Sequence, residues 1–264
     1  MTIGIVGTGN AAWALGKLSK NAGHDILFVL GRDEAMMVEL AKELSSKPIV
    51  EKHEIFVAPD ITLLAVADDS ISQVCEGLTP LRLDTIMTHL SGSTSITSIS
   101  KHHSPAGVMY PMQTLRRGFI SGPDSIPFYI NATDAGSLAK LKKYAQSLSN
   151  RVFEIDDEQR RKLHLAAVIT NNFINYQLMA VYDFLQDQQI SFQHLKPLLE
   201  ETMNKFIRVP PEISQTGPAK RGDLNVIKRH LELLKSHQDL HELYYLFSKL
   251  IYEKYHPKEK FPKR

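Results

Sequence analysis

The stretch TIGIVGTGNAA, residues 2–12, decides how the first half of the chain folds. An apolar run, Thr2–Val6, is followed by a glycine-rich turn and then by a helical pattern over Asn10–Asn21. A strand, a tight turn and a helix in this order, with G-x-G-x-x-A spacing, are typical of the turn that holds the pyrophosphate of a dinucleotide. The sequence therefore predicts a dinucleotide site at this turn.

In this interpretation, the geometry of the turn requires a small residue at three positions. Gly7 permits the tight turn, Gly9 lets the pyrophosphate approach the backbone, and Ala12 lets the helix pack closely against the strand. The helix amino terminus then faces the phosphates. The predicted cofactor-binding residues of the turn are Gly7, Thr8, Gly9, Asn10 and Ala11. The alternative is a tight strand-to-helix turn that binds nothing.

The end of the second predicted strand indicates which dinucleotide binds. An NAD site places an acidic residue there, about 20 residues after the turn, to bind the ribose hydroxyls. The chain instead reads Val29-Leu30-Gly31-Arg32-Asp33, and Arg32 is placed to pair with a 2′-phosphate. We therefore expect NADP. The alternatives are a solvated Arg32, or NAD held by Asp33 if the strand ends later.

Short apolar runs alternate with amphipathic stretches through residues 1–155. This alternation predicts parallel strands joined by crossover helices that cover both faces of a sheet. The fold class is therefore α/β, with a doubly wound parallel sheet. The predicted strands are Thr2–Val6, Asp25–Leu30, Ile61–Val66, Thr85–Leu90, Pro127–Asn131 and Arg151–Ile155.

The pattern becomes entirely helical after Ile155. We expect a dinucleotide-binding domain over residues 1–155 and an all-α domain over residues 156–264. The predicted helices run from Asp156 to about Gln186, from Ser191 as N-cap to about Ile207, from Asp223 as N-cap to Ser236, and over Gln238–Tyr255. A helix of about 30 residues spans about 45 Å, more than a compact subdomain covers alone. We therefore expect a homodimer formed through the C-terminal helices.

Composition and charge exclude several classes of protein. The chain of 264 residues has 31 Lys+Arg and 29 Asp+Glu, so its formal net charge of +2 provides no strong field for nucleic acid or an anionic membrane. The longest apolar stretch, near Leu63–Ala67, is far shorter than the ~20 residues that span a bilayer. We expect no signal peptide and a cytoplasmic location.

Metal and disulfide scaffolds are also excluded by the residues available. The single cysteine, Cys75, can form neither an intramolecular disulfide nor a thiolate set for structural zinc. His237 and His241 are four residues apart, but the carboxylate motif of a zinc protease does not accompany them. We expect no metal, and a small-molecule substrate in place of a nucleic-acid or membrane partner.

Five segments together resemble a known family along essentially the whole chain. They are GIVGTGNAAW (4–13), LLAVADDSI (63–71), HLSGS (89–93), YPMQTL (110–115) and TGPAKRGD (216–223). The chain is similar to Rossmann-like NADP oxidoreductases with a C-terminal helical domain of unknown function. Their layout is similar to that of pyrroline-5-carboxylate reductase and the 6-phosphogluconate dehydrogenase-like superfamily. The resemblance implies an intertwined homodimer in which a long helix closes the active site.

The resemblance also implies roles for residues that follow two strands. Ala65, Val66, Ala67 and Asp68 would line the cofactor, because loops at strand carboxyl ends border the crevice. Asp68 has an alternative role as the N-cap of the next helix. His89 and Ser91 would lie near the nicotinamide ring. The alternatives are a structural histidine and serines that cap the next turn.

The proton donor is not identified by the sequence. Hydroxyacid dehydrogenases of the superfamily use a lysine four residues before an asparagine, and here Ala167 and Val168 precede Asn171 and Asn172 at that spacing. Asn172 is kept as a candidate site residue. His164 could replace the lysine, although a lone helical histidine is more often a surface residue. Tyr110 can donate a proton, but relatives commonly have histidine there.

The segment 216–223 places two cations before a helix. Lys220 or Arg221 could bind a substrate carboxylate, and Arg221 is the predicted site residue because its geometry is bidentate. The alternative is a solvated connection. We expect NADPH to reduce a small carbonyl or imine that bears a carboxylate. A non-catalytic NADP-binding sensor or assembly protein is the alternative, because the lysine is missing.

Overall fold

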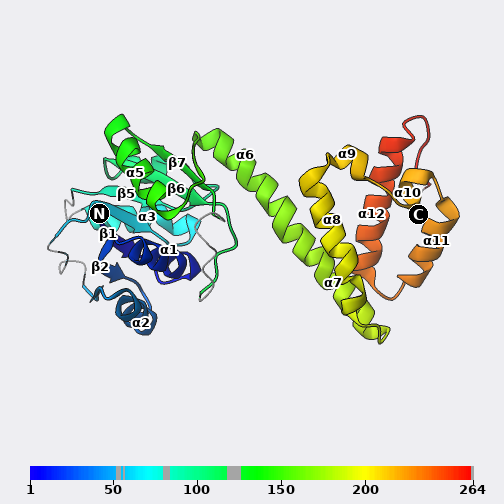
Figure 1. Ribbon diagram of the computed structural model, residues 1–264, viewed down its shortest axis with the longest axis horizontal. Coiled ribbons are helices and arrows are strands. Elements are labelled where there is room, and N and C mark those ends of the chain that lie inside the picture. Colours follow the sequence, from blue (N-terminus) through cyan, green and yellow to red (C-terminus); the bar gives the residue numbers. More distant parts are fainter. Residues whose placement is uncertain (52–54, 56, 80–83, 118–125, 263–264) are drawn as a thin grey trace. The chain divides into compact units, whose positions relative to one another are not determined.

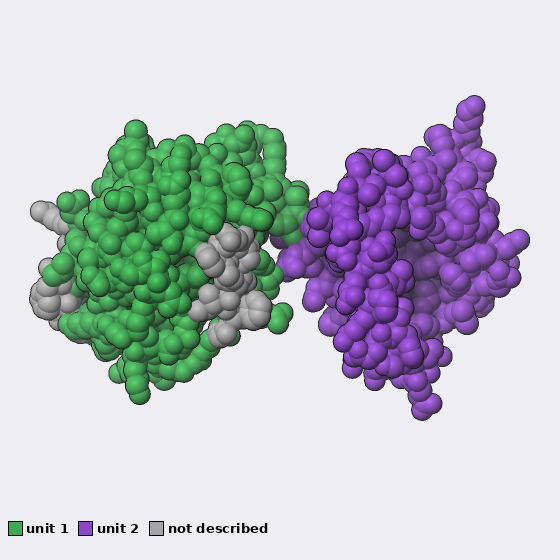
Figure 2. Space-filling model, in the orientation of Figure 1, with its two compact units in different colours: residues 1–167 green, residues 168–264 purple. Residues whose placement is uncertain are grey.

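The chain folds into two compact units, Met1–Ala167 and Val168–Arg264 (Figure 2). The structure is a computed structural model and describes residues 1–51, 55, 57–79, 84–117 and 126–262. Contacts group the helix that follows residue 155 with the first unit as far as Ala167. The α/β fold class of the first unit and the helical character of the remainder are confirmed.

One eight-stranded sheet organises the first unit, with strand order β3-β2-β1-β4-β5-β6-β7-β8 (Figure 1). All neighbouring pairs are parallel except β6 and β7, which are antiparallel. The strands are β1 (Thr2–Val6), β2 (Asp25–Leu30), β3 (Lys47–Ile49), β4 (Ile61–Leu64), β5 (Ile86–His89), β6 (Ala106–Pro111), β7 (Phe128–Ala132) and β8 (Val152–Glu154).

Two strands lie outside the predicted pattern. β3 is a three-residue strand that contains Pro48, and proline is tolerated at the edge of a sheet where β3 lies. β6 is entirely buried, yet Gly107 and Pro111 conceal its strand character in the sequence. Because β6 and β7 are antiparallel, the prediction of a wholly parallel sheet is corrected to a mostly parallel one.

Helices cover both faces of the sheet, and each face has its own apolar core. The helices of the first unit are α1 (Asn10–Asn21), α2 (Glu34–Leu44), α3 (Ile71–Leu78), α4 (Thr97–Ser100), α5 (Ala135–Leu148) and α6 (Asp157–Ala167), with a 3₁₀ turn, η2, at Asp68–Ser70. Side chains alternate along the central strands. Leu63 of β4 lies in the core under α1, α2 and α5, whereas Leu64 lies in the core under α3 and α4.

The second unit is entirely helical in its described part. Its elements are a π-helical segment (Val168–Phe173), α7 (Ile174–Asp187), a 3₁₀ turn, η6 (Phe192–Leu195), α8 (Lys196–Arg208), α9 (Pro211–Ser214), α10 (Pro218–Arg221), α11 (Leu224–Leu233) and α12 (Gln238–Tyr255). The helical run predicted from Asp156 is thus interrupted by a π-helical segment. Ser191 caps its helix as predicted, because its side chain accepts a hydrogen bond from the Gln193 N–H.

Burial in the second unit is unevenly distributed. A small core gathers around Ala219, Ile227, Tyr252 and Phe261. By contrast, neither α7 nor α8 has a single buried residue. Among the described residues, no helix combines the length and the apolar character needed to cross a bilayer.

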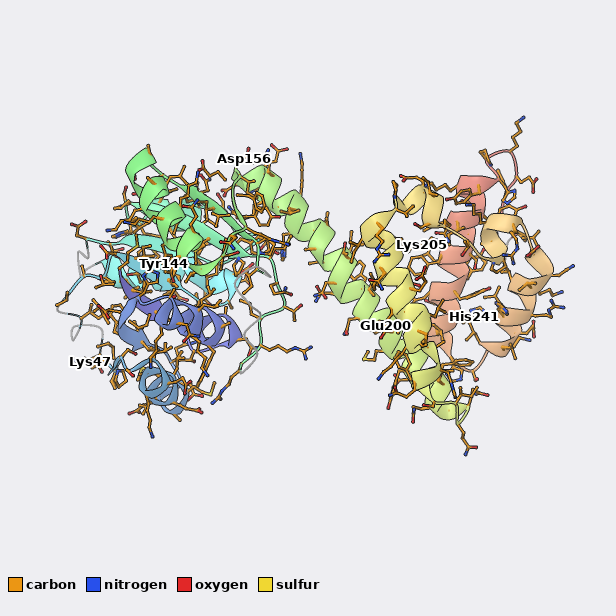
Figure 3. All side chains as sticks on the ribbon, viewed as in Figure 1. Lys47, Tyr144, Asp156, Glu200, Lys205 and His241 are labelled. Atoms are coloured by element: carbon orange, nitrogen blue, oxygen red, sulfur yellow. The ribbon has the colours of Figure 1, made fainter. Side chains whose placement is uncertain are left out.

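A buried hydrogen bond joins α1 to α5 under the sheet. Ser19 Oγ and Tyr144 Oη are 2.6 Å apart, and both residues are 0% exposed. Tyr144 is labelled on α5 in Figure 3. Ser19 Oγ also donates to the Leu15 carbonyl at 2.6 Å, so the Tyr144 hydroxyl is the donor in the pair. Burial raises the pKa of Tyr144, which keeps this donor protonated.

Removing Ser19 will therefore cost more than removing the Tyr144 hydroxyl. Ser19→Ala leaves a buried hydroxyl without a partner and is expected to destabilise the protein by about 2 kcal/mol. Tyr144→Phe leaves the Ser19 bond to Leu15 intact and is expected to cost about 1 kcal/mol. Urea unfolding of both variants and of the double variant measures the coupling. Additive effects of the two substitutions would contradict the pairing.

Candidate cofactor and active site

The glycine turn after β1 has a geometry that only glycine adopts easily. Gly7 has φ +119°, and a Cβ atom added there would lie 2.1 Å from the Ala65 carbonyl oxygen. Its N–H donates to the Leu30 carbonyl at 2.8 Å, and the Ala65 N–H donates to the Val6 carbonyl at 2.7 Å. The turn is thus held between the ends of the two strands that flank β1.

The amino terminus of α1 has the features that a pyrophosphate needs. Gly9 is the N-cap residue, no side chain caps the helix, and the first turn contains no acidic residue. A Cβ atom built on Gly9 would find nothing within 4 Å among the described residues. Free N–H groups and the positive end of the helix dipole therefore meet open space, which fits an anionic group.

The remaining residues of the turn have structural partners. Thr8 packs against Gly31, since a Cβ atom added to Gly31 would lie 2.5 Å from Thr8 Cγ2. Asn10 Oδ1 accepts a hydrogen bond from the Arg117 N–H at 3.0 Å, so this amide oxygen holds the segment after β6. Ala11 is half-buried, and Ala12, at 1% exposure, packs in the core as the spacing predicted.

Arg32 and Asp33 are placed differently from each other. Arg32 is exposed, two residues beyond β2, and within the described ranges its guanidinium has no hydrogen bond or ion pair. Asp33 is the N-cap of α2, and its Oδ1 accepts from the Met36 N–H at 3.0 Å. The arginine is therefore available to a ligand, whereas the carboxylate is occupied by its own helix.

A small hydroxyl network connects the ends of β4 and β5. Asp68 follows Ala67, the N-cap residue of η2, and its Oδ2 accepts from Ser91 Oγ and Ser93 Oγ, both at 2.6 Å. The Asp68 side chain does not cap η2, because it bonds to the neighbouring loop. Ser91 Oγ in turn accepts from the Ser93 and Thr94 N–H groups, so the turn-capping role foreseen for Ser91 is present.

His89 lies at the end of β5, fully inside the protein. It is 0% exposed, and its Nδ1 accepts from the Ser91 N–H at 3.2 Å. Burial, together with the nearby Arg160 charge, lowers the pKa of His89 to about 4. At neutral pH His89 is therefore an uncharged ring that supports the loop carrying Ser91.

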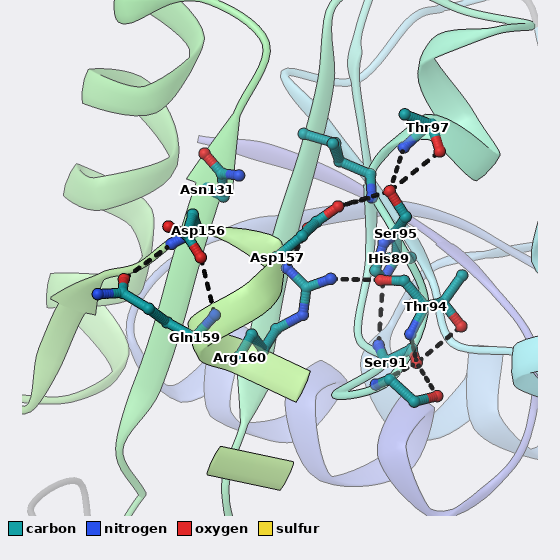
Figure 4. A network of polar contacts seen from close by, with 12 residues as sticks. His89, Ser91, Thr94, Ser95, Thr97, Asn131, Asp156, Asp157, Gln159 and Arg160 are labelled. Atoms are coloured by element: carbon teal, nitrogen blue, oxygen red, sulfur yellow. Dashed lines mark hydrogen bonds and ion pairs between the residues drawn. The ribbon is translucent and has the colours of Figure 1, made fainter. Parts of the chain in front are cut away.

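An ion pair on α6 holds the same loop from the other side (Figure 4). Arg160, at 1% exposure, pairs with Asp157 at 2.7 Å and donates to the Thr94 carbonyl. Asp157 Oδ2 accepts from the Ile96 N–H at 2.9 Å and from Ser95 Oγ. Asp157 lies in the first turn of α6, where the helix dipole favours an acidic residue. Its i, i+3 spacing to Arg160 is the signal that could have identified the pair.

Tyr110 and His164 come together beside this loop. Tyr110 Oη lies 3.1 Å from His164 Nδ1, and the rings meet edge-on with centroids 5.5 Å apart. Burial, the Tyr129 hydroxyl and the Asp68 carboxylate raise the pKa of Tyr110. Each residue was a separate candidate in the sequence. Nothing in their spacing indicates that they form a pair.

The candidate site residues of the second unit are Asn172, Lys220 and Arg221, and the two cations have local partners. Asn172 lies in the π-helical segment and is exposed. Lys220 Nζ donates to the Gln215 carbonyl at 2.8 Å and lies 4.8 Å from the centroid of the Tyr255 ring. Arg221 pairs with Asp223 at 2.9 Å, where both side chains are exposed. Asp223 occupies the N-cap position of α11, but its side chain makes no capping hydrogen bond, which corrects the predicted cap.

A mostly apolar pocket lies within the second unit, with a volume of about 260 Å³. Three parts of the chain line it: Gln177 and Val181 of α7, the segment Thr216–Ala219, and Leu240, Leu243, Tyr244, Phe247, Ser248 and Ile251 of α12. The segment 216–223 therefore forms part of the pocket wall with Thr216–Ala219, and it also carries Lys220 and Arg221.

Two family models match different parts of the chain. Residues 2–87 match the family described as NADP oxidoreductase coenzyme F420-dependent, and residues 126–251 match a domain of unknown function, DUF2520. A candidate NADP oxidoreductase of known structure from Bacteroides fragilis is 34% identical, with a TM-score of 0.89, over 96% of this chain and 98% of that one. No curated protein matches the chain.

Two more distant structures share the fold. A pyrroline-5-carboxylate reductase from Coxiella burnetii is 16% identical, with a TM-score of 0.59, over 98% of each chain. A reductive aminase from Aspergillus terreus, in complex with NADPH, is 13% identical, with a TM-score of 0.72, over 98% of this chain and 94% of that one. The fold and the glycine turn define a two-domain dinucleotide-binding protein. The chain belongs to the NADP oxidoreductase family of the Bacteroides fragilis protein, as the resemblance implied.

The two glycines of the turn should respond differently to alanine. Gly7→Ala combines a positive φ with a clash against Ala65 and is expected to destabilise the protein by about 2–4 kcal/mol. Gly9→Ala meets open space at φ −77° and should leave stability within about 1 kcal/mol of wild type. Its methyl group should nevertheless weaken NADPH binding at least about tenfold. Thermal unfolding and cofactor titration separate the two effects, and full NADPH affinity in Gly9→Ala would contradict the assigned phosphate site.

Proposed function

We propose that this protein is an NADPH-dependent reductase of a small carbonyl or imine compound that bears a carboxylate. One observation carries the proposal: the glycine turn and the amino terminus of α1 are open to an anion, and Arg32, without a partner among the described residues, follows the adjacent strand. A turn that only shaped the backbone would need neither feature.

The residues present fit NADP better than NAD. The N–H groups at the start of α1 would bind the pyrophosphate, and the Arg32 guanidinium would pair with the 2′-phosphate in a bidentate manner. Asp33, which could have bound the ribose hydroxyls of NAD, caps α2 instead. Ala67 and Asp68 would border the cofactor at the end of β4. When bound, NADPH supplies a hydride, and the protein supplies orientation and electrostatics.

The substrate class is inferred from two further observations. The names of two proteins with this fold, a pyrroline-5-carboxylate reductase and a reductive aminase, refer to compounds with carbon–nitrogen bonds. For this chain they support an imine or a related carbonyl compound. The carboxylate is supported by Arg221, because its solvent-exposed pairing with Asp223 is weak enough to be exchanged for a ligand.

We also propose that the protein is a homodimer formed through its C-terminal helices. The support is that α7 and α8 bury no residue in the single chain although both carry large apolar side chains. The exposed apolar residues of these helices include Tyr176, Met179, Tyr182, Leu198, Met203, Phe206 and Ile207. Apolar surface of this extent is typical of an interface between subunits.

Cofactor titration and turnover together test the proposed function. The single tryptophan, Trp13, lies in α1, and we use its fluorescence to follow NADPH binding. Arg32→Ala should raise the Kd for NADPH about 10- to 100-fold and leave the Kd for NADH unchanged, because only the 2′-phosphate is lost as a partner. The exposed Lys101→Ala variant is the control.

Wild-type NADPH oxidation is then followed by stopped flow against a panel of keto acids and cyclic imines. Turnover with at least one member supports the reductase. Equal affinity of the wild type for NADPH and NADH would contradict the assignment of Arg32. Tight NADPH binding without turnover on any member of the panel would instead favour a cofactor sensor or assembly protein.

The dimer is tested by light scattering and sedimentation over a range of concentrations. Leu198→Glu combined with Phe206→Glu should raise the dimer Kd at least about tenfold, because two exposed apolar side chains of α8 become charged. Leu233→Glu is the control, since Leu233 is more exposed than either residue but lies on α11. A monomeric wild type, or equal effects of both sets of substitutions, would exclude this interface.

A further inference from the structure

Two titratable side chains from distant parts of the chain form a pair in the first unit. Tyr110 lies on β6 and His164 on the last turn of α6, 54 residues later. The phenol oxygen lies 3.1 Å from His164 Nδ1, within hydrogen-bonding distance. Tyr110 is 9% exposed and the histidine half-buried, so the pair stands at the border between core and solvent.

The pair lies at the edge of the sheet where the candidate site is found. Val108 of β6 is the register partner of His89, the last residue of β5, and Tyr110 lies two residues further towards the carboxyl end of β6. Ser91 is bound to Asp68, and the Asp68 carboxylate is one of the groups that raise the pKa of Tyr110. In parallel sheets the carboxyl ends of the strands border the ligand crevice. Tyr110 and His164 are therefore at the level of the predicted site.

Gly92 allows the histidine to reach this place. A Cβ atom added at Gly92 would lie 2.5 Å from His164 Nδ1 and 2.6 Å from its Cγ. The two flanking serines, Ser91 and Ser93, are both fixed to Asp68 by their hydroxyls. The loop thus presents a residue without a side chain to the imidazole ring, and the ring packs directly on its backbone.

The hydroxyl of Tyr110 decides which nitrogen of His164 carries a proton. Burial first, and then Tyr129 and Asp68, raise the pKa of Tyr110, so the phenol stays neutral. A neutral phenol oxygen can accept a hydrogen bond from Nδ1–H of both the imidazolium and the neutral imidazole. In that arrangement Nε2 is the nitrogen that gains and loses a proton. Across the described part of the chain, His164 Nε2 has no hydrogen-bond partner.

We infer that His164 is the proton donor of the reductase, through Nε2–H, and that Tyr110 is the positioning residue that holds its tautomer and orientation. This inference rests on the proposed function. Reduction of a C=O or C=N group needs a hydride and a proton. The substrate carbon gains the hydride as NADPH is oxidised to NADP⁺, and the electron pair of the double bond moves to oxygen or nitrogen. That atom takes the Nε2 proton, so an imidazolium becomes a neutral imidazole that solvent reprotonates.

Two titratable groups act on Tyr110, namely Tyr129 of β7 and Asp68 of η2. Arg160 and Arg161 precede His164 by about one turn of α6. Arg160 is already neutralised by Asp157. His89 is uncharged at neutral pH because burial and the Arg160 charge lower its pKa to about 4, which excludes it as the acid. Because the reaction takes its proton from His164, the activity is expected to fall as pH rises.

Nuclear magnetic resonance of the protein without cofactor tests the pairing independently of activity. With ¹⁵N-labelled histidine, the neutral His164 ring of the wild type should show the Nδ1–H tautomer. Tyr110→Phe should remove this preference, whereas Tyr129→Phe, which changes a neighbouring phenol that no described contact joins to His164, should keep it. An Nε2–H tautomer in the wild type would overturn the role of Tyr110.

Kinetics on a substrate that the wild type reduces test the proton donor. His164→Asn should lower kcat by about 10²- to 10³-fold and abolish the fall of activity with pH, while NADPH affinity stays at the wild-type value. Gly92→Ala should give a similar loss, because its methyl group displaces the imidazole. Tyr110→Phe should cost about tenfold and shift the midpoint of the pH profile. The exposed His194→Asn variant is the control.

The outcomes distinguish the inference from the proposed function. A wild type that binds NADPH but reduces no member of the panel would overturn both. Turnover by the wild type, with an unchanged rate and pH profile in His164→Asn, would overturn only the assignment of the proton donor. Loss of NADPH binding in His164→Asn would instead indicate a structural role and would also overturn it.

Discussion

The close approach of Gly7 to the Ala65 carbonyl is the constraint on which the rest of the first unit depends. The positive φ of Gly7 lets the chain leave β1 and start α1 while the ends of β2 and β4 stay hydrogen-bonded on either side. The direction of α1 follows from this turn, and with it the open amino terminus of the helix. A side chain at this one position would push the turn away from the sheet and separate the helix from the site.

The polar groups lie at the carboxyl ends of the parallel strands, because the loops after β4, β5 and β6 all begin there. Asp68 holds the loop after β5 from one side, and Arg160 with Asp157 holds it from the other. Burying an arginine is costly unless its charge is paired and its N–H groups find acceptors. The pairing therefore fixes α6 against this loop in one arrangement, and His164 is positioned one turn further along α6.

The helices after Ile155 were predicted from their hydrophobic period, and the structure confirms only part of that prediction. The span Gln238–Tyr255 was predicted with its observed bounds, and Ser191 caps as foreseen. The run from Asp156 was predicted as one α-helix, but it contains the π-helical segment Val168–Phe173. A period of about 3.6 residues predicts that a helix exists, yet it does not register a local change of hydrogen-bond partner.

The sequence by itself determined the doubly wound architecture, the glycine turn and the exposed Arg32, because each is a local matter of hydrophobic period, backbone freedom or position after a strand. It could not decide the antiparallel direction of β7, since direction depends on which strand a segment pairs with. Nor could it predict that Tyr110 contacts His164, 54 residues away, or that Arg160 donates to the Thr94 carbonyl, 66 residues away. Only the folded sheet and α6 bring such distant groups within hydrogen-bonding distance, because their contacts follow from packing and not from spacing along the chain.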